Sequence, residues 1–421
     1  MIPPMIGLRR FSKGNWPALS CAEMLGGLFL TLLLCSPVEA QRANEGLLRN
    51  AETAYQDINR RFWMGTASTG HLAIISQDKD VVGSASEIPA QKGWLWQYAE
   101  GWNPIYAYWK TTKSSDAKTR LIAEWHWVLR NWSIYDLRKC GEVGGQAATT
   151  QDDSSWVAMG LLQLYEATGD ARALSYAKEA IDCAYARWHD EVTGGGLWYD
   201  DRHNEKTGKS VSNGNFALAM LKLYDFTCSA GHCHKTYLQN AAGIANWAAA
   251  RLRREDGLYW MSVNGQGVPN APQRPNDIAI SKSVVALFGN MAFAALDTRL
   301  YELTKDTKYR ERLGPTANSI SRLEARDGVF IDDRDARGNA YAAWDFAHTV
   351  VRYLDQSAAM KKLYADTGQA VVQNDRAADG SYGGDWSGPV EGVWAAAGFH
   401  KHRLEITGNA VMWPIAAAEF R

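Results

Sequence analysis

The chain has 421 residues, which is enough for one domain with a large buried core. Its 45 Lys and Arg residues nearly balance its 46 Asp and Glu residues, so no field of one sign exists to attract nucleic acid or anionic lipid. The 18 Trp and 18 Tyr side chains have flat apolar faces that can fill a core or stack on a ligand ring. Composition therefore argues against a nucleic-acid partner.

The segment 1–40 has the order of a signal peptide. Arg9, Arg10 and Lys13 precede an apolar run over 24–34, and small residues follow as far as Ala40. The run is too short to span ~30 Å of hydrocarbon, and no later stretch is apolar enough to do so. We expect residues 1–40 to be removed on export, leaving a secreted or periplasmic protein with no membrane contact.

The predicted mature chain, residues 41–421, contains no Pro-rich or Ser-rich linker that would divide it. Gly265–Pro275 is the nearest candidate, and we interpret it as a long loop. We therefore expect one domain, acting as a monomer.

Cysteine usage is typical of an oxidising compartment. Four cysteines follow residue 40: Cys140, Cys183, Cys228 and Cys233. Cys228 and Cys233 flank a short turn, which favours a disulfide between them. His232 and His234 lie beside this pair, but their spacing does not match common zinc sites, so no metal or other cofactor is expected.

A phrase made of an apolar residue, Tyr, Thr and then Gly, Asp or Lys recurs along the chain at intervals of roughly 60 residues. The copies lie at 164–170, 221–227, 300–306 and 362–368, with a looser copy starting at Tyr108. Each interval fits two helices and two connections.

Apolar residues in 156–165 have helical spacing, and Gly169 supplies a C-cap. A second helix over 174–188 precedes Gly194–Gly196, which a helix interior would not tolerate cheaply. About 380 residues at this interval give about six helix hairpins. We predict an all-α (α/α)6 barrel, a six-hairpin toroid with short β segments in loops, such as 197–199 and 329–331. An open solenoid of hairpins is the competing architecture.

The strongest local signal for chemistry is Asp152-Asp153 directly before the helix that ends near Gly169. A helix N-cap is the simplest interpretation, but one carboxylate suffices for capping and a second adds repulsion. Glycosidic cleavage needs two carboxyl groups in different protonation states, and neighbouring charges separate their pKa values. Adjacent residues can also place the carboxyls ~5 Å apart, the separation associated with retention of configuration.

Residues that could contact a sugar surround this pair in the sequence. Gly194–Gly196 lets a loop approach a ligand and present the aromatic faces that follow it. Core packing or surface placement is the alternative for each of these side chains. The candidate substrate contacts are Trp94, Trp96, Trp156, Trp198, Tyr199, Lys209 and Asn213.

Over residues 150–225 the sequence resembles family 76 of the glycoside hydrolases, the α-1,6-mannanases. The resemblance rests on Asp152-Asp153 followed by Trp156, on the helix end at 164–170, and on the segments 194–199 and 209–218. It implies that Asp152 is the nucleophile and Asp153 the acid/base of a retaining hydrolase acting on a polysaccharide or oligosaccharide.

Other functions on the same fold stay open. A transglycosylase differs only in what intercepts the intermediate, and a non-catalytic carbohydrate-binding protein would keep the aspartates only as caps. An epimerase would need paired His side chains, and a lyase for acidic sugars would need a basic site; neither pattern is present. Glu391 is a reserve carboxylate.

Overall fold

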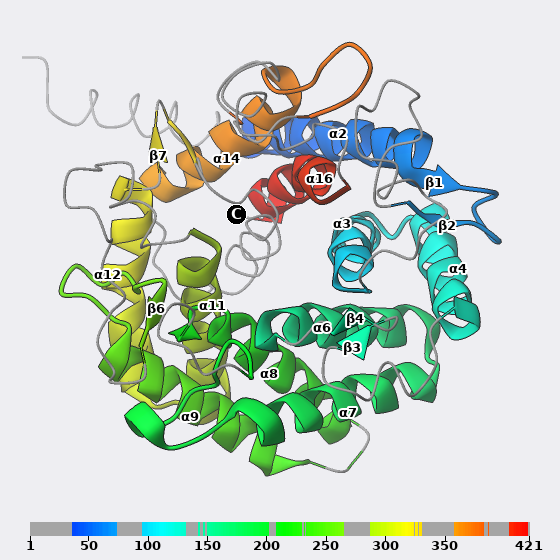
Figure 1. The fold of residues 1–421 in the computed structure, drawn as a ribbon. Helices are drawn as coiled ribbons and strands as arrows, with labels where there is room; N and C mark the ends of the chain where they lie inside the picture. The colour runs from blue at the N-terminus through cyan, green and yellow to red at the C-terminus, as the bar shows by residue number, and fades with distance from the viewer. Residues whose placement is uncertain are drawn as a thin grey trace, which may run out of the picture. The chain divides into compact units, whose positions relative to one another are not determined.

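The structure is a computed structural model, drawn in Figure 1. It describes residues 36–73, 95–131, 142–143, 146–147, 150–201, 208–229, 231, 233–264, 287–323, 325–326, 328–330, 358–382, 386 and 404–419. The chain divides into two compact units, Met1–Glu45 and Gly46–Arg421. The described part of the first unit is the start of helix α2 (Ser36–Phe62), and the rest of the architecture belongs to the second.

The described residues form eleven α-helices, arranged in two concentric layers in the second unit (Figure 1). The inner layer contains α3 (Leu95–Thr112), α6 (Gln151–Thr168), α8 (Asn213–Ser229), α11 (Leu287–Thr304) and α16 (Leu404–Glu419). The outer layer contains α2, α4 (Ser115–Asn131), α7 (Ala171–Trp188), α9 (Lys235–Arg251), α12 (Thr307–Leu323) and α14 (Ala358–Gln373). Successive helices pair as inner–outer hairpins, so the predicted all-α toroid is confirmed.

The ring closes on itself. Helix α16, near the end of the chain, packs against α3, and each described inner helix from α3 to α11 contacts the next. In the outer layer, Asp57 of α2 accepts hydrogen bonds from Arg376 Nε at 2.7 Å and from the Tyr382 hydroxyl at 2.9 Å. These contacts join the first described helix to a segment late in the sequence, which an open solenoid does not do.

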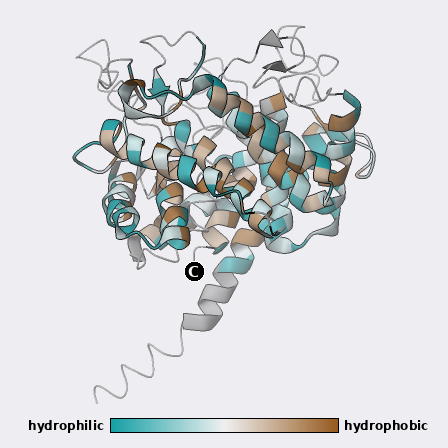
Figure 2. Cartoon of the chain, turned by 90° about the horizontal axis from the view of Figure 1, so that it is seen from below, coloured by the Kyte–Doolittle hydropathy of each residue, from teal (hydrophilic) through white to brown (hydrophobic). Residues whose placement is uncertain are grey.

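Burial explains why the two layers have different sequence patterns. Helix α7 buries one stripe that includes Tyr176, Ile181 and Trp188, whereas α6 buries 13 of its 18 residues because helices surround it. Hydrophilic and hydrophobic residues alternate along the helices in Figure 2. No helix in the described ranges has a long enough apolar stretch to cross a bilayer.

The connections from inner to outer helices are short, and we call them the turn end: residues 113–114, 169–170 and 305–306. Lys113, Gly169 and Lys305 have φ of 61°, 73° and 60°, and each donates its N–H to the carbonyl four residues earlier. These are left-handed C-caps, which confirms the predicted role of Gly169. The copies at 164–170 and 300–306 and the looser copy starting at Tyr108 include these caps, and the copy at 221–227 lies within α8.

The copy of the phrase at 362–368 is different, because it lies in the outer helix α14. Gly368 is inside that helix, and a Cβ there would lie 3.0 Å from the Pro414 Cα and the Trp413 carbonyl oxygen of α16. This glycine therefore serves close helix packing rather than capping. The similarity of this copy to the others does not reflect an equivalent position in the fold.

The segments that follow the outer helices contain all the described strands, and we call their described residues the site end: 63–73, 142–143, 146–147, 189–201, 208–212, 253–263, 325–326, 328–330 and 376–382. Strand β1 (Trp63–Met64) pairs with β2 (His71–Leu72), and β3 (Glu142–Val143) pairs with β4 (Gln146–Ala147). Strand β5 (Lys209–Ser210) pairs with β6 (Ser262–Val263), and β7 (Ala325–Arg326) pairs with β8 (Val329–Phe330). All four pairs are antiparallel. Of the two predicted β segments, 329–331 contains β8, and 197–199 contains only a single bridge, Leu197 with His189.

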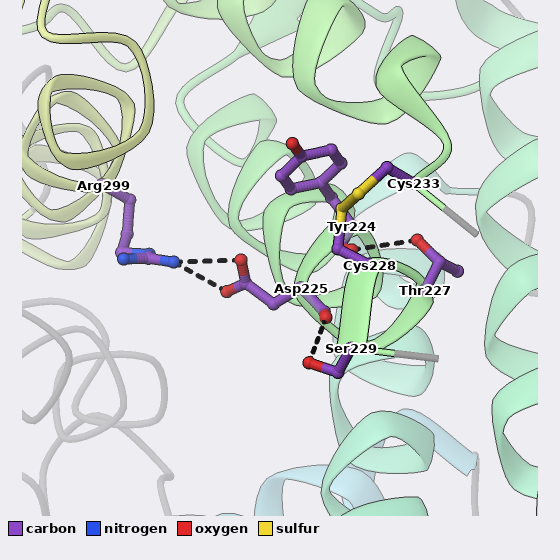
Figure 3. Close-up of a disulfide and its surroundings, with 7 residues drawn as sticks. All are labelled: Tyr224, Asp225, Thr227, Cys228, Ser229, Cys233 and Arg299. Carbon is purple, nitrogen blue, oxygen red and sulfur yellow. Dashed lines mark hydrogen bonds and ion pairs between the residues drawn. A yellow bond between two sulfur atoms is a disulfide. The ribbon is translucent and has the colours of Figure 1, made fainter. Parts of the chain in front are cut away.

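The disulfide expected between Cys228 and Cys233 is present where α8 ends (Figure 3). Cys183 is also disulfide-bonded. Beside the Cys228–Cys233 bridge, Asp225 of α8 accepts two hydrogen bonds from Arg299 of α11, at 2.8 and 3.0 Å. Neighbouring inner helices are thus also joined by an ion pair near the turn end. The expected loop at 265–275 lies outside the described residues.

Candidate active site

Asp152 and Asp153 lie in the first turn of α6, but neither is its N-cap. The cap is Thr150, whose hydroxyl accepts the Asp153 N–H at 3.2 Å. The Ser155 hydroxyl donates to the Asp152 carbonyl at 2.7 Å. Both aspartates are partly exposed at the positive end of the helix, where ionised carboxylates are stabilised. Thr150 therefore fills the N-cap role that the simple interpretation gave to the aspartates.

The loop 189–200 is hydrogen-bonded to the start of α6. Thr150 forms an antiparallel bridge with Asp200, and the Gln151 N–H donates to the Tyr199 carbonyl at 2.7 Å. Tyr199 in turn donates its own N–H to the Gly208 carbonyl at 2.9 Å. Two segments that lie on either side of helix α7 in the sequence thus meet where the aspartates lie.

The Tyr199 side chain is within electrostatic reach of both aspartates. Burial raises the pKa of its phenol, and the negative charges of Asp152 and Asp153 raise it further. The hydroxyl therefore stays protonated at neutral pH and is available as a hydrogen-bond donor. This brings together three of the residues singled out in the sequence.

Trp198 and Lys209 have different surroundings from Tyr199. Trp198 is only 4% exposed, and its indole N–H donates to Asp190 Oδ2 at 2.6 Å. Lys209 is 0% exposed, and its ammonium contacts Asp190 Oδ1 at 2.6 Å. The same ammonium donates to backbone carbonyls of Asp190, Val192 and Gly195 at 3.2, 2.8 and 2.7 Å. An ammonium has three donors, so these four acceptors engage all of them.

Asn213 is also fully buried and is bonded to backbone. Its side chain accepts the Leu197 N–H at 2.8 Å and donates to the Leu197 and Ser210 carbonyls at 3.0 and 2.9 Å. Gln151 makes a similar link, because its side-chain amide donates to the Ser212 carbonyl at 3.1 Å. In this arrangement Lys209 and Asn213 contact the loop and not an open surface.

The remaining predicted aromatic contacts are buried in α6 or lie wholly or partly outside the described residues. Trp156 is 4% exposed within α6. Trp94 and the reserve carboxylate Glu391 lie outside the described residues, and of Trp96 only the backbone in α3 is described. In the ranges that the structure covers, no three His, Cys, Asp or Glu side chains are grouped so as to hold a metal ion.

Sequence reasoning missed three residues that shape this site: Thr150, Gln151 and Asp190. Thr150 could have been found, because Thr followed three residues later by an acidic residue resembles a capping box. Gln151 and Asp190 carry no sequence signal, since their roles depend on a loop that folds back onto α6.

Comparisons with known proteins agree with the fold. Residues 47–410 match the model of glycosyl hydrolase family 76. The structure is similar to that of an inactive variant of an α-1,6-mannanase from Salegentibacter sp. HEL1_6 in complex with α-1,6-mannotriose, with 14% identity, coverage of 89% of this chain and 100% of that chain, and a TM-score of 0.66. The structure is also similar to a family 76 mannosidase from Bacteroides thetaiotaomicron VPI-5482, with 15% identity, coverage of 89% of this chain and 98% of that chain, and a TM-score of 0.65.

A third similar structure is Dfg5 from Chaetomium thermophilum in complex with glucosamine, with 16% identity, coverage of 89% and 90%, and a TM-score of 0.65. No curated protein sequence matches the chain. The family model nevertheless spans most of the 421 residues, and the paired helices form the toroid seen in these neighbours. The chain therefore belongs to glycosyl hydrolase family 76.

Proposed function

We propose that the protein is an exported hydrolase that cleaves α-1,6-mannosidic, or related α-glycosidic, linkages in a polysaccharide or oligosaccharide by a retaining mechanism. The observation that carries the proposal is the pair Asp152-Asp153 in the first turn of α6, where Thr150 already supplies the cap. Two carboxylates are thus available for the two roles that glycosidic cleavage requires.

In the proposed mechanism, the Asp152 carboxylate attacks the anomeric carbon while Asp153 donates a proton to the departing glycosidic oxygen. The resulting glycosyl ester is hydrolysed when Asp153, now a base, takes a proton from the attacking water. The positive end of α6 favours the ionised form of the nucleophile. The Tyr199 hydroxyl lies within electrostatic reach of the same carboxylates, which raise its pKa and keep it neutral.

The comparisons support this choice of substrate class. In the Salegentibacter mannanase, two adjacent aspartates were replaced by asparagine to give the inactive variant that was solved with α-1,6-mannotriose. An adjacent aspartate pair in the first turn of a helix is the feature that this chain presents at residues 152 and 153. We infer the same chemistry here from that correspondence and from the family.

The test is hydrolysis of linear α-1,6-mannan by wild type and by the variants Asp152→Asn and Asp153→Asn. Asn removes the charge but not the shape, so each variant should stay folded while turnover falls by at least ~10²-fold. Asp170→Asn is the matched control, because Asp170 caps α7 at the turn end and Asn is an equally good cap. The control should keep wild-type turnover.

If both variants hydrolyse mannan as fast as wild type, the pair is structural and the mechanism is wrong. A wild type that is inert on mannan but cleaves another α-glycan overturns only the substrate. The anomeric configuration of the first product, read by NMR, tests retention separately. Transfer of the glycosyl group to an added acceptor sugar, rather than to water, would indicate a transglycosylase. Binding of mannan without turnover would indicate a carbohydrate-binding protein.

Export is a separate part of the proposal. Its support is the basic, then apolar, then small-residue order of the segment 1–40. Production with export should yield a monomeric protein whose N-terminus is Gln41, read by N-terminal sequencing. A protein recovered with the segment 1–40 intact would contradict it.

A further inference from the structure

The loop 189–200 is held from one side by two buried polar side chains that the reaction itself does not require. Lys209 gathers the carbonyls of Asp190, Val192 and Gly195 around one ammonium. Asn213 brackets Leu197 by bonding both its N–H and its carbonyl. Both side chains are 0% exposed, so water cannot replace the bonds that they make.

The same loop is bonded to the residues at which α6 begins. Leu197 is two residues before Tyr199, whose carbonyl accepts the Gln151 N–H, and Asp200 forms the bridge with Thr150. Gln151 is the first residue of α6 and directly precedes Asp152. Asn213 is therefore linked to the turn that carries the aspartates by its bonds to Leu197, the backbone of 197–199, and the bond from the Gln151 N–H to the Tyr199 carbonyl.

Lys209 reaches this chain through Asp190. The Asp190 carboxylate accepts both the Lys209 ammonium and the Trp198 indole N–H, so one carboxylate fixes the residue next to Tyr199. The Lys209 ammonium also lies 5.2 Å from the centre of the Trp198 ring. Helix α9 also contacts the loop 189–200, because Arg251 Nε donates to the Thr193 carbonyl at 3.0 Å.

We propose that Lys209 and Asn213 are positioning residues, which set the place of Asp152 and Asp153 through the loop 189–200 and do not bind the sugar. The expected effect on turnover rests on the proposed function, whereas the claim that the loop holds the first turn of α6 in place does not. Small displacements of reacting groups lower turnover strongly, whereas contacts that bind the ground state mainly affect KM.

The fold offers a matched control one hairpin further along. Asn290 of α11 is also fully buried and brackets Tyr259 in the same way, accepting its N–H at 2.7 Å and donating to its carbonyl at 3.4 Å. No bond described for Tyr259 reaches the first turn of α6. Asn213→Ala and Asn290→Ala thus remove the same kind of bracket. The first holds the loop that bonds the Gln151 N–H directly, whereas the second holds the loop of β6, which reaches α6 one step further away, through β5 and residues 211–212.

The experiment measures amide hydrogen exchange and mannan hydrolysis for both variants. In Asn213→Ala, exchange at Gln151 should accelerate by at least ~10-fold, because its acceptor on Tyr199 is no longer held. Its kcat should fall by about 10- to 100-fold with KM within about threefold of wild type. In Asn290→Ala, exchange should accelerate at Tyr259 and not at Gln151, and kcat should stay within about threefold.

Asp190→Asn provides the same test without removing a buried side chain, since Asp190 is partly exposed. It weakens the Lys209 contact and should give a smaller loss of kcat, about tenfold, with KM unchanged. This variant decides the question if Asn213→Ala does not fold.

The inference is overturned if Gln151 exchange is unchanged in the folded variants, or if KM rises while kcat is kept, which would mean contact with the sugar. Equal losses of kcat in Asn213→Ala and Asn290→Ala would also overturn it, because the effect would then be general. A wild type inert on mannan contradicts the proposed function alone, since the exchange measurement still decides whether the loop positions the turn.

Discussion

The two ends of the toroid solve the same problem, reversing the chain between helices, in different ways. At the turn end, one residue in the left-handed conformation and one backbone hydrogen bond close each connection, as at Lys113, Gly169 and Lys305. At the site end, the connections are longer and a buried side chain bonds the backbone of each of several loops. The pairs are Glu124 with Leu72, Asn213 with Leu197, Asn290 with Tyr259, and Thr367 with Phe330.

The connections at the two ends of the toroid therefore depend on different interactions. Turn-end connections depend on local backbone preferences, so they tolerate exposed side chains and differing sequences. Site-end loops depend on buried polar groups from a neighbouring helix, which fix the loop position but are expensive to leave unpaired. An end built in this way can hold two carboxylates in a defined geometry, at the cost of sensitivity to single substitutions.

The largest expected effect uses pH to compare the fully buried carboxylate of Glu124, which bonds a loop of the site end, with the partly buried carboxylate of Glu166 near the turn end. Complete burial raises the pKa of Glu124 to about 7, although hydrogen bonds from Trp102 and Leu72 lower it. At the turn end burial opposes ionisation of Glu166, but Lys222, Lys110 and Tyr106 hold its pKa at about 2.

Glu124 binds a proton more tightly in the folded state than in the unfolded state. Its stabilising contribution is therefore fully present below pH ~4.3, the ordinary value for Glu, and is lost as pH rises to about 7. Urea unfolding should show wild type losing about 3 kcal/mol across this window relative to Glu124→Gln. Glu166→Gln should show only a small slope of the opposite sign, because that carboxylate is ionised in the folded state throughout and partly protonated in the unfolded state only near pH ~4.3. If the free energy of unfolding changes with pH in the same way for Glu124→Gln and wild type, the pKa of Glu124 is not raised in the folded state.

A smaller effect compares one glycine from each end. Gly169 and Gly196 both have φ of 73°, but a Cβ at Gly169 meets nothing within 4 Å, whereas at Gly196 it would lie 2.5 Å from the Trp247 ring. Gly169→Ala should cost about 1 kcal/mol for the left-handed conformation alone. Gly196→Ala adds overpacking and should cost about 2 kcal/mol more. Both losses are measured as shifts of the urea unfolding midpoint, with the dependence of the unfolding free energy on urea unchanged. Equal losses in the two variants would show that the Trp247 side chain moves to accommodate the added methyl group.

Much of the frame was predictable from the sequence, because helical periodicity and caps are local properties. The start of α6 at the aspartates, the cap at Gly169 and the Cys228–Cys233 pair all depend on residues close together in the chain. The phrase at 362–368 misleads for the same reason: its letters match a helix end, but packing against α16 places Gly368 inside a helix.

The contacts of the site were harder to predict, because they depend on which backbone atoms a folded loop brings together. Lys209 looks like a surface residue in sequence, and only the fold of 190–195 supplies the three carbonyls that surround its amine. Trp156 and Trp198 look like sugar platforms, yet both are 4% exposed, one in a helix and one in a loop. Tyr199 is the predicted aromatic that the structure brings beside both aspartates.

The smallest effect concerns a cap of the turn end that lacks glycine. Lys305 occupies the same left-handed position as Gly169, with φ of 60°, and its ammonium is 5.9 Å from the Tyr301 ring. The left-handed conformation costs a non-glycine residue roughly 1–2 kcal/mol, and glycine loses roughly 0.5–1 kcal/mol of that gain through its greater unfolded-state entropy. Lys305→Gly should therefore stabilise the protein by about 0.5–1 kcal/mol, seen as a higher urea midpoint with an unchanged slope. Lys118→Gly makes the same chemical change at an exposed position inside α4 and should destabilise by about 1 kcal/mol. Opposite signs for the two substitutions would show that the turn end is governed by backbone conformation, and a loss of stability in both would show that the Lys305 side chain matters more than its φ.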